Sequence, residues 1–178
     1  MSGPLLRLET DRLRLYELSA ELATDATFIF QLLNEPSFLS NIGDRGVHSL
    51  EDARAYLLKG PVASYLARGF GLYRVQLRET GESAGLCGLV KRPGLQDVDL
   101  GYALLPAFWG RGYAAEAAAA VLADARARLG LSRIVAITDP ANQGSIRVLE
   151  KLGFGFESLV QLGPGTTVLK LFASPPPR

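Results

Sequence analysis

The chain has 178 residues, with 19 basic and 18 acidic side chains and a formal net charge of +1. This length suits one domain that buries roughly 70% of its unfolded surface, and the near-neutral charge argues against nucleic acid as an obligate partner. No apolar run reaches the ~20 residues of a membrane span, and the start MSGPLLRLETDR lacks the apolar core of a signal peptide. The single cysteine, Cys87, cannot form an internal disulfide, so we expect a cytoplasmic protein with no membrane partner.

The first half of the chain mixes strand and helix patterns. Apolar and polar residues alternate over residues 11–18, which is typical of a half-buried strand. Apolar residues at helical spacing follow over residues 22–34, and a capping box formed by Ser49 and Asp52 predicts a short helix over residues 50–58. The pattern then predicts three antiparallel strands joined by turns, over residues 70–79, 84–92 and 97–105.

The second half predicts two further helices. The first covers residues 114–129, and the second begins at a capping Asn142 and ends at Gly153. A near-continuous apolar strand over residues 132–138 lies between them, and two short strands close the chain at residues 156–160 and 166–172. We therefore predict one α/β domain over residues 1–172, with about seven strands of mixed direction and about four helices. A disordered proline-rich tail is expected over residues 173–178.

The stretch PAFWGRGYAAEA, residues 106–117, begins the long helix without a Ser, Thr, Asp or Asn cap. Its first backbone N–H groups are therefore bare, and the helix dipole lies behind them. Glycines without a Cβ let a bulky oxyanion approach such amides closely. One interpretation is a phosphate site formed by Gly110, Arg111, Gly112, Tyr113 and Ala114; the alternative is a tight turn that binds nothing.

Two common phosphate-binding motifs do not fit this loop. A nucleoside-triphosphate loop requires Lys-Ser or Lys-Thr after its last glycine, and neither pair follows here. The letters GRGYAA match the dinucleotide motif G-x-G-x-x-G/A, but that motif needs an acidic residue about twenty positions later, where Ser132 and Arg133 stand. The loop also follows antiparallel strands rather than a parallel β-α-β unit.

The run WGRGYA together with NQGSIRVLEKLGF resembles the Gcn5-related N-acetyltransferase (GNAT) superfamily. The spacing FWGRGYAAEA and the segments TDRLRL and DLGYALLP are similar to the branch of ribosomal-protein N-terminal acetyltransferases, the RimJ/RimL-like enzymes. The resemblance covers residues 8–172. It implies a mostly antiparallel sheet whose fourth and fifth strands splay apart, acetyl-CoA as cosubstrate, and no metal.

By this resemblance, the pyrophosphate of acetyl-CoA would lie on the amides from Gly110 to Ala114, and the pantetheine would follow the strand that ends at Leu104. A backbone N–H of Leu104 or Leu105 would polarise the thioester carbonyl. Asn142 would both cap its helix and contact the pantetheine or acetyl group. Arg111 would add a charge-assisted contact, or be a solvated loop residue.

The catalytic groups are less regular. Many family members carry a Tyr that protonates the departing thiolate, and this chain has Leu149 at that position. Ser145 is the best replacement, with helix capping as the alternative role. Asp99 is the first choice for the base, with a solvated carboxylate as the alternative. Glu116 lies in the first turn of its helix, where a carboxylate meets the dipole favourably, so we interpret it as structural.

The resulting prediction is an N-acetyltransferase that moves an acetyl group from acetyl-CoA to a primary amine by direct attack in a ternary complex. A weak base such as Asp99 suits an α-amine better than a lysine. Expected partners are an amine-bearing small molecule or a protein N-terminus; a homodimer, a longer acyl donor and an O-acceptor stay open. The alternative is a non-catalytic acyl-CoA-binding sensor or scaffold. Cys87 is expected in the core, and nothing marks the only histidine, His48, as a base or ligand.

Overall fold

One eight-stranded sheet runs through the molecule in the order β1-β2-β3-β4-β5-β6-β8-β7. The computed structural model describes residues 3–177. Every neighbouring pair of strands is antiparallel except β5 and β6, which are parallel, so the predicted mixed, mostly antiparallel α/β sheet is confirmed. The strands are β1 Leu6–Glu9, β2 Leu13–Glu17, β3 Leu72–Leu77, β4 Ser83–Val90, β5 Asp99–Leu104, β6 Val135–Thr138, β7 Gly155–Val160 and β8 Leu169–Ala173.

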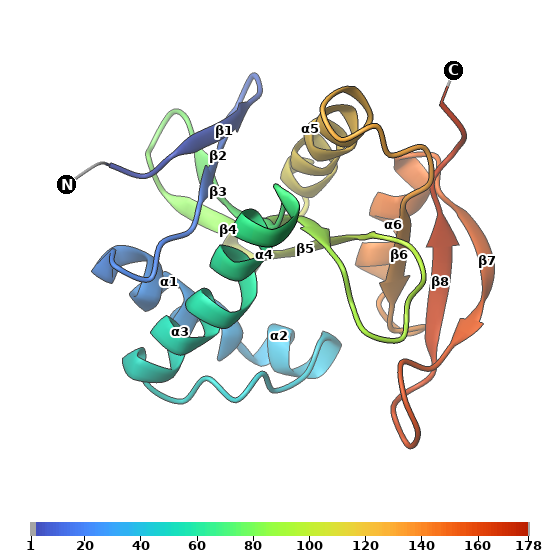
Figure 1. The fold of residues 1–178 in the computed structure, drawn as a ribbon, viewed down its shortest axis with the longest axis horizontal. Helices are drawn as coiled ribbons and strands as arrows, with labels where there is room; N and C mark the ends of the chain where they lie inside the picture. Colours follow the sequence, from blue (N-terminus) through green and yellow to red (C-terminus); the bar gives the residue numbers. More distant parts are fainter. Residues whose placement is uncertain (1–2, 178) are drawn as a thin grey trace.

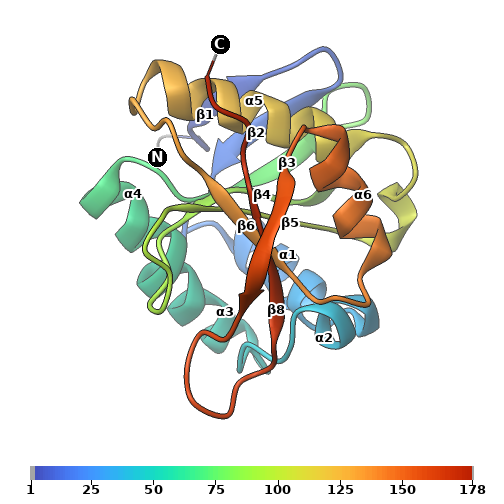
Figure 2. The same cartoon turned by 90° about the vertical axis from the view of Figure 1, so that its right-hand side faces the viewer.

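Helices cover both faces of this sheet. Four of them gather on one face of β2–β5, while α5 crosses the other face with α6 beside it (Figures 1 and 2). Apolar side chains from both layers meet the sheet in one core. None of the described helices is both long enough and apolar enough to cross a membrane. The helices are α1 Ala23–Leu33, α2 Pro36–Asn41, α3 Leu50–Leu57, α4 Ala63–Arg68, α5 Tyr113–Ala127 and α6 Gln143–Lys151, with a π-helical turn η1 at Leu58–Val62 and a short 3₁₀ turn η2 at Pro106–Phe108.

Three elements were not predicted, each for a physical reason. Strand β1 is a short edge strand whose side chains are largely exposed, so it has no alternating apolar pattern. Helix α2 has six residues, which is too short for a helical period to be visible. Helix α4 continues from α3 through η1. The Gly60–Pro61 pair in η1 is typical of the end of a helix, so the sequence pattern does not indicate this continuation. The remaining predicted strands and helices are present, with boundaries shifted by a few residues.

The sheet divides where β5 meets β6. These two strands pair only at Asp99 and Val135, and along the rest of its length β6 is paired on its other side with β8. Strands β6, β8 and β7 accordingly run in a different direction from β4 and β5 (Figure 1). The fourth and fifth predicted strands correspond to β5 and β6, and their predicted splaying is confirmed. The splaying leaves a gap beside the carboxyl-terminal part of β5.

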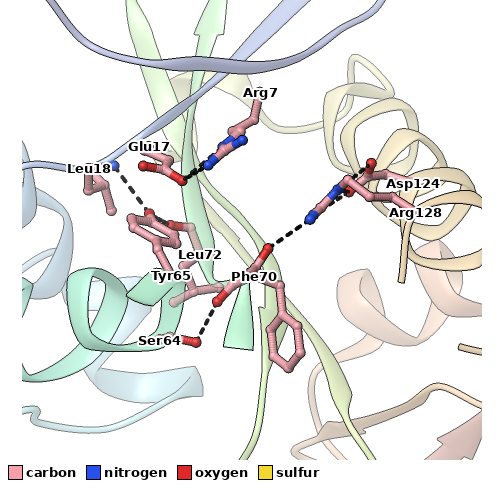
Figure 3. A network of polar contacts seen from close by, with 10 residues as sticks. Arg7, Glu17, Leu18, Ser64, Tyr65, Phe70, Leu72, Asp124 and Arg128 are labelled. Atoms are coloured by element: carbon pink, nitrogen blue, oxygen red, sulfur yellow. Dashed lines mark hydrogen bonds and ion pairs between the residues drawn. The ribbon is translucent and has the colours of Figure 1, made fainter. Parts of the chain in front are cut away.

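A polar network fixes the end of α4 between the two sides of the molecule (Figure 3). The Tyr65 hydroxyl accepts a hydrogen bond from the Leu18 amide at 3.1 Å and donates to the Leu72 carbonyl. Arg128, at the end of α5, donates from Nη1 to the Gly69 carbonyl at 3.0 Å. These bonds connect α4 to the end of β2, to β3 and to α5 on the opposite face of the sheet, so they fix the position of α4.

The end of the chain is held more closely than predicted. Ala173 belongs to β8, the Ser174 amide donates to the Ile134 carbonyl at 2.8 Å, and Arg126 Nη2 donates to the Pro175 carbonyl at 2.9 Å. The prediction of a disordered tail is therefore wrong for residues 173–175. The short apolar pattern of the last strand gave no sign that its hydrogen bonding extends into the proline-rich segment.

Candidate functional site

The loop that enters α5 is built on two left-handed glycines. Gly110 has φ 72° and Gly112 has φ 79°, a region in which residues with a Cβ are strained. Gly112 is the N-cap residue of α5, and no side chain caps this helix. The first amides of α5 therefore keep their donors free, at the end of the helix where the dipole favours an anion.

The turn between β1 and β2 holds this loop in place. Arg12 donates from Nη1 to the Arg111 carbonyl at 2.9 Å, and its guanidinium lies over the Tyr113 ring at 4.5 Å. Glu116 accepts hydrogen bonds from the Thr10 hydroxyl at 2.6 Å and from Arg12 Nε at 2.7 Å. Although partial burial acts in the opposite direction, these hydrogen bonds lower the pKa of Glu116. The structural interpretation of Glu116 thus gains partners that the sequence pattern did not indicate.

The backbone of β5 directs donors toward the gap. The Leu105 amide donates to the Ala84 carbonyl on β4 at 2.8 Å, so the prediction that Leu105 offers a free N–H is wrong. Because successive amides of an antiparallel strand point in opposite directions, the Leu104 N–H points away from β4 and toward the gap. The Leu104 carbonyl accepts a hydrogen bond from Trp109 Nε1 at 2.9 Å, which fixes the base of the loop.

Ser145 lies on α6, across the gap from β5. Its amide donates to Asn142 Oδ1 at 3.1 Å, so Asn142 is the cap residue, as predicted, and the Ser145 hydroxyl is not needed for capping. The Tyr102 hydroxyl, from β5, lies 3.0 Å from Ser145 Oγ and donates to the Ser145 carbonyl at 2.9 Å. Burial raises the pKa of Tyr102, so its hydroxyl stays protonated near neutral pH.

Asp99 lies at the point where β5 and β6 are joined, and its side chain is fully buried. Its carboxylate accepts hydrogen bonds from Arg92 Nε at 3.0 and 3.2 Å. Burial raises the pKa of Asp99, and the adjacent Arg92 opposes that shift. Since β5 side chains alternate, Asp99 lies on the opposite face of the strand from Tyr102. Because Asp99 is fully buried, the alternative of a solvated carboxylate is wrong.

One cavity of about 1180 Å³ connects these groups. It begins at the α5 loop, passes between β5 and β6, and continues to α2, α3 and the segment between β7 and β8. It brings together most of the residues predicted for the site, namely Asp99, Leu104, Gly110, Gly112, Tyr113, Ala114, Asn142 and Ser145. Arg111 and Leu105 do not line it.

The residues of this cavity that sequence reasoning missed include Tyr56, Arg92 and Tyr102. Tyr102 stands in the segment DLGYALLP, where its polar hydroxyl within an otherwise apolar strand was the available signal. Arg92 and Tyr56 reach the cavity only through the packing of α3 and β4, so no local pattern marks them.

The other residues singled out in the sequence have structural surroundings. Leu149 is 1% exposed and packs in the core, as does the fully buried Cys87. His48 is exposed, its Nε2 lies 3.4 Å from the Asp44 carboxylate, and it does not line the cavity.

Comparisons with known proteins agree with this arrangement. A family model described as the acetyltransferase (GNAT) domain matches residues 12–155. YoaA of Bacillus subtilis, an uncharacterised N-acetyltransferase, is 29% identical over 157 residues, which cover 86% of this chain and 85% of that protein. A GNAT-family acetyltransferase from Bordetella pertussis superposes with a TM-score of 0.77 at 27% identity, covering 98% of this chain and 100% of the other.

A more distant likeness concerns the fold alone. RimL, the ribosomal L7/L12 α-N-protein acetyltransferase, in complex with coenzyme A, superposes with a TM-score of 0.76 at 20% identity, covering 94% of this chain and 96% of that one. The match of the family model over most of the chain, together with the bare α5 amides and the splayed strands, decides the assignment: the chain belongs to the GNAT family and is an acetyltransferase.

Proposed function

We propose that the protein transfers an acetyl group from acetyl-CoA to a primary amine, with both substrates bound at once. The observation that carries the proposal is the single cavity that leads from the bare α5 amides, past Ser145, to Asp99. A cofactor entering at α5 and an amine entering from the side of α2 and α3 would meet beside β5, without an intermediate carrier on the protein.

The cofactor end suits a diphosphate. Two left-handed glycines, Gly110 and Gly112, put no Cβ of their own beside the amides from Gly110 to Ala114, and no other atom lies within 4 Å of where a Cβ on Gly110 would be. Arg147 and Lys151 of α6 line the same cavity and offer positive charge to further phosphate oxygens. Acetyl-CoA supplies an activated acetyl thioester. The gap between β5 and β6 is where its pantetheine arm would lie, in reach of the Asn142 side chain.

In the transfer, the amine nitrogen bonds to the acetyl carbon, the carbon–sulfur bond breaks, and the thiolate gains a proton. The Leu104 N–H faces the gap and is suited to stabilise negative charge on the carbonyl oxygen. The Ser145 hydroxyl would donate a hydrogen bond to sulfur. Tyr102 donates its one hydroxyl hydrogen to the Ser145 carbonyl and lies 3.0 Å from Ser145 Oγ, so it would hold the serine in position beside the gap.

Asp99 is the proposed base, acting on the ammonium of the acceptor directly or through water. Its burial raises its pKa, and a carboxylate of higher pKa is a better base near neutral pH. Deprotonating an α-amine of pKa about 8 costs roughly 1.4 kcal/mol at pH 7, whereas a lysine costs roughly 4.6 kcal/mol. A carboxylate already paired with Arg92 is adequate for the first task, so an α-amine or another amine of low pKa is the proposed acceptor group.

The proposal is tested by measuring the thiol released from acetyl-CoA with a panel of amines and peptides. Ser145→Ala should lower kcat and leave the KM for acetyl-CoA unchanged. Asn142→Ala is the matched variant, because it removes the helix cap and keeps the serine hydroxyl. Full activity in Ser145→Ala would remove the serine from the mechanism. Tight coenzyme A binding with no thiol release from any amine would instead support the non-catalytic sensor or scaffold.

A further inference from the structure

The end of the cavity farthest from α5 is strongly basic. We call this region the acceptor end and define it by Phe38, Arg45, Tyr56, Lys59, Arg92 and Asp99. Lys91 and Arg68 also line the cavity. Among the described residues that line the whole cavity, the carboxylates are Asp99 and Asp139, and Asp139 belongs to the turn before α6, where it accepts from the Ala141 amide at 2.8 Å. Asp99 is thus the one described carboxylate at the acceptor end.

The negative charge of Asp99 is already matched. Its carboxylate is paired with Arg92 at 3.0 Å inside the protein. Arg45 and Lys59 form no ion pair with any carboxylate among residues 3–177. The Lys91 ammonium donates to the neutral carbonyls of Leu95 and Gln96, so its charge is not neutralised either. The acceptor end therefore carries an excess of positive charge that no described group of the protein compensates.

Two of these cations line the cavity together with the half-buried Tyr56. Burial raises the pKa of the Tyr56 hydroxyl, and the positive charges of Arg45 and Arg92, which line the same cavity, act against that rise. Tyr56 comes from α3, Arg45 from the segment between α2 and α3, and Arg92 from the residues after β4. Three separate segments thus direct hydrogen-bond donors into one region of the cavity.

We propose that the acceptor is an amine that also carries an anionic group, a carboxylate or a phosphate, and that Arg45 and Lys59 bind this group. The inference rests on the proposed transferase function and names its substrate class. Polyamines and other polycations are excluded by like-charge repulsion at these side chains. The same cations favour the neutral form of a nearby amine, because positive surroundings lower the pKa of an ammonium group. The cations of the acceptor end therefore select the substrate and assist the deprotonation of its amine.

The test compares acceptors that differ only in charge. Three peptide amides share an N-terminal alanine: Ala-Glu-Glu, Ala-Gln-Gln and Ala-Lys-Lys. Phosphoethanolamine against ethanolamine forms a second pair, which separates phosphate from carboxylate recognition. Thiol release should give a kcat/KM at least about tenfold higher for the anionic member of one pair or both, with the lysine peptide slowest, and the preference should weaken as salt rises.

Variants assign the preference to the two named side chains. The double variant Arg45→Glu, Lys59→Glu should abolish or invert the preference while leaving the KM for acetyl-CoA unchanged. Arg54→Glu is the matched control, since Arg54 is an exposed basic residue on α3 that does not line the cavity. The more conservative pair Arg45→Gln, Lys59→Gln covers the case in which the reversed charges reduce stability.

The possible failures are distinguishable. Equal rates with anionic and neutral amines, or faster reaction of the lysine peptide, would overturn the inference and leave the transferase function standing. An anionic preference that survives in both double variants would overturn the assignment to Arg45 and Lys59. No thiol release from any amine would overturn the proposed function, and this inference with it.

Discussion

Replacing Gly112 by alanine separates the role of the α5 loop in binding from its role in stability. Gly112 has φ 79°, and an alanine held in this left-handed region costs about 1–2 kcal/mol. An added Cβ would lie 3.4 Å from Arg12 Nη2, an ordinary contact, so the protein itself offers little steric resistance. For a chain of this size, each 1 kcal/mol corresponds to about 2–4 °C in Tm. We therefore expect a loss of roughly 2–8 °C.

The effect on the cofactor should be larger. Because an alanine is strained at this φ, we expect the loop to shift and to misplace the α5 amides proposed to bind the diphosphate, and a hydrogen bond to a charged group contributes about 1.5–3 kcal/mol. Loss of one such bond weakens coenzyme A binding by about tenfold to hundredfold. Isothermal titration calorimetry measures the affinity, and a thermal melt of the same sample measures the stability.

Gly130→Ala is the matched control for this experiment. Gly130 follows α5 and has φ 67°, an added Cβ there would meet no other atom within 4 Å, and the residue does not line the cavity. The variant should therefore lose a similar amount of stability and keep its full affinity for coenzyme A. Equal affinities in Gly112→Ala and Gly130→Ala would refute the view that the α5 amides bind the diphosphate.

Three further outcomes are expected. Tyr102→Phe should lower kcat about tenfold and leave the KM for acetyl-CoA unchanged, because it removes one hydrogen bond of about 1 kcal/mol or more from Ser145; an unchanged kcat would contradict this. Cys87 should resist thiol reagents at pH 8 until the protein unfolds, since burial raises its pKa to about 12; fast labelling of the native protein would show otherwise. Glu116 has a pKa below its usual 4.5, so its contribution to stability is present above that pH and is lost as the pH falls through the lowered value. The stability of Glu116→Gln in urea unfolding should accordingly approach that of the wild type as the pH falls below 4.5, and a constant difference would oppose this reasoning.

The sequence predicted the parts of the fold that repeat a local pattern. The alternation in β2 and the capping residues of α3 and α6 are local, and each appears where it was expected. The edge strand β1 and the α3–η1–α4 run were missed because their formation depends on packing rather than on periodicity. Eight strands therefore stand where about seven were predicted.

The candidate site shows the same division. The glycines of the α5 loop and the cap at Asn142 are visible in the sequence, since each depends on a few neighbouring residues. The contact between Tyr102 and Ser145 joins residues 43 positions apart, and it could not be predicted without the relative placement of β5 and α6. The error at Leu105 has a similar origin, because the direction of an amide depends on the register of β4 and β5.

The divergence of β5 from β6 leaves an exposed ladder of backbone groups in the middle of a sheet, where other strands have a neighbour. Tyr102 and Leu104 direct their amides into this interruption. A bound pantetheine arm would occupy the position of the missing neighbour and bridge two blocks of the sheet whose strands otherwise pair at a single position. Amide hydrogen exchange along β5 is thus expected to slow when coenzyme A is added, and the two blocks should then unfold as one cooperative unit.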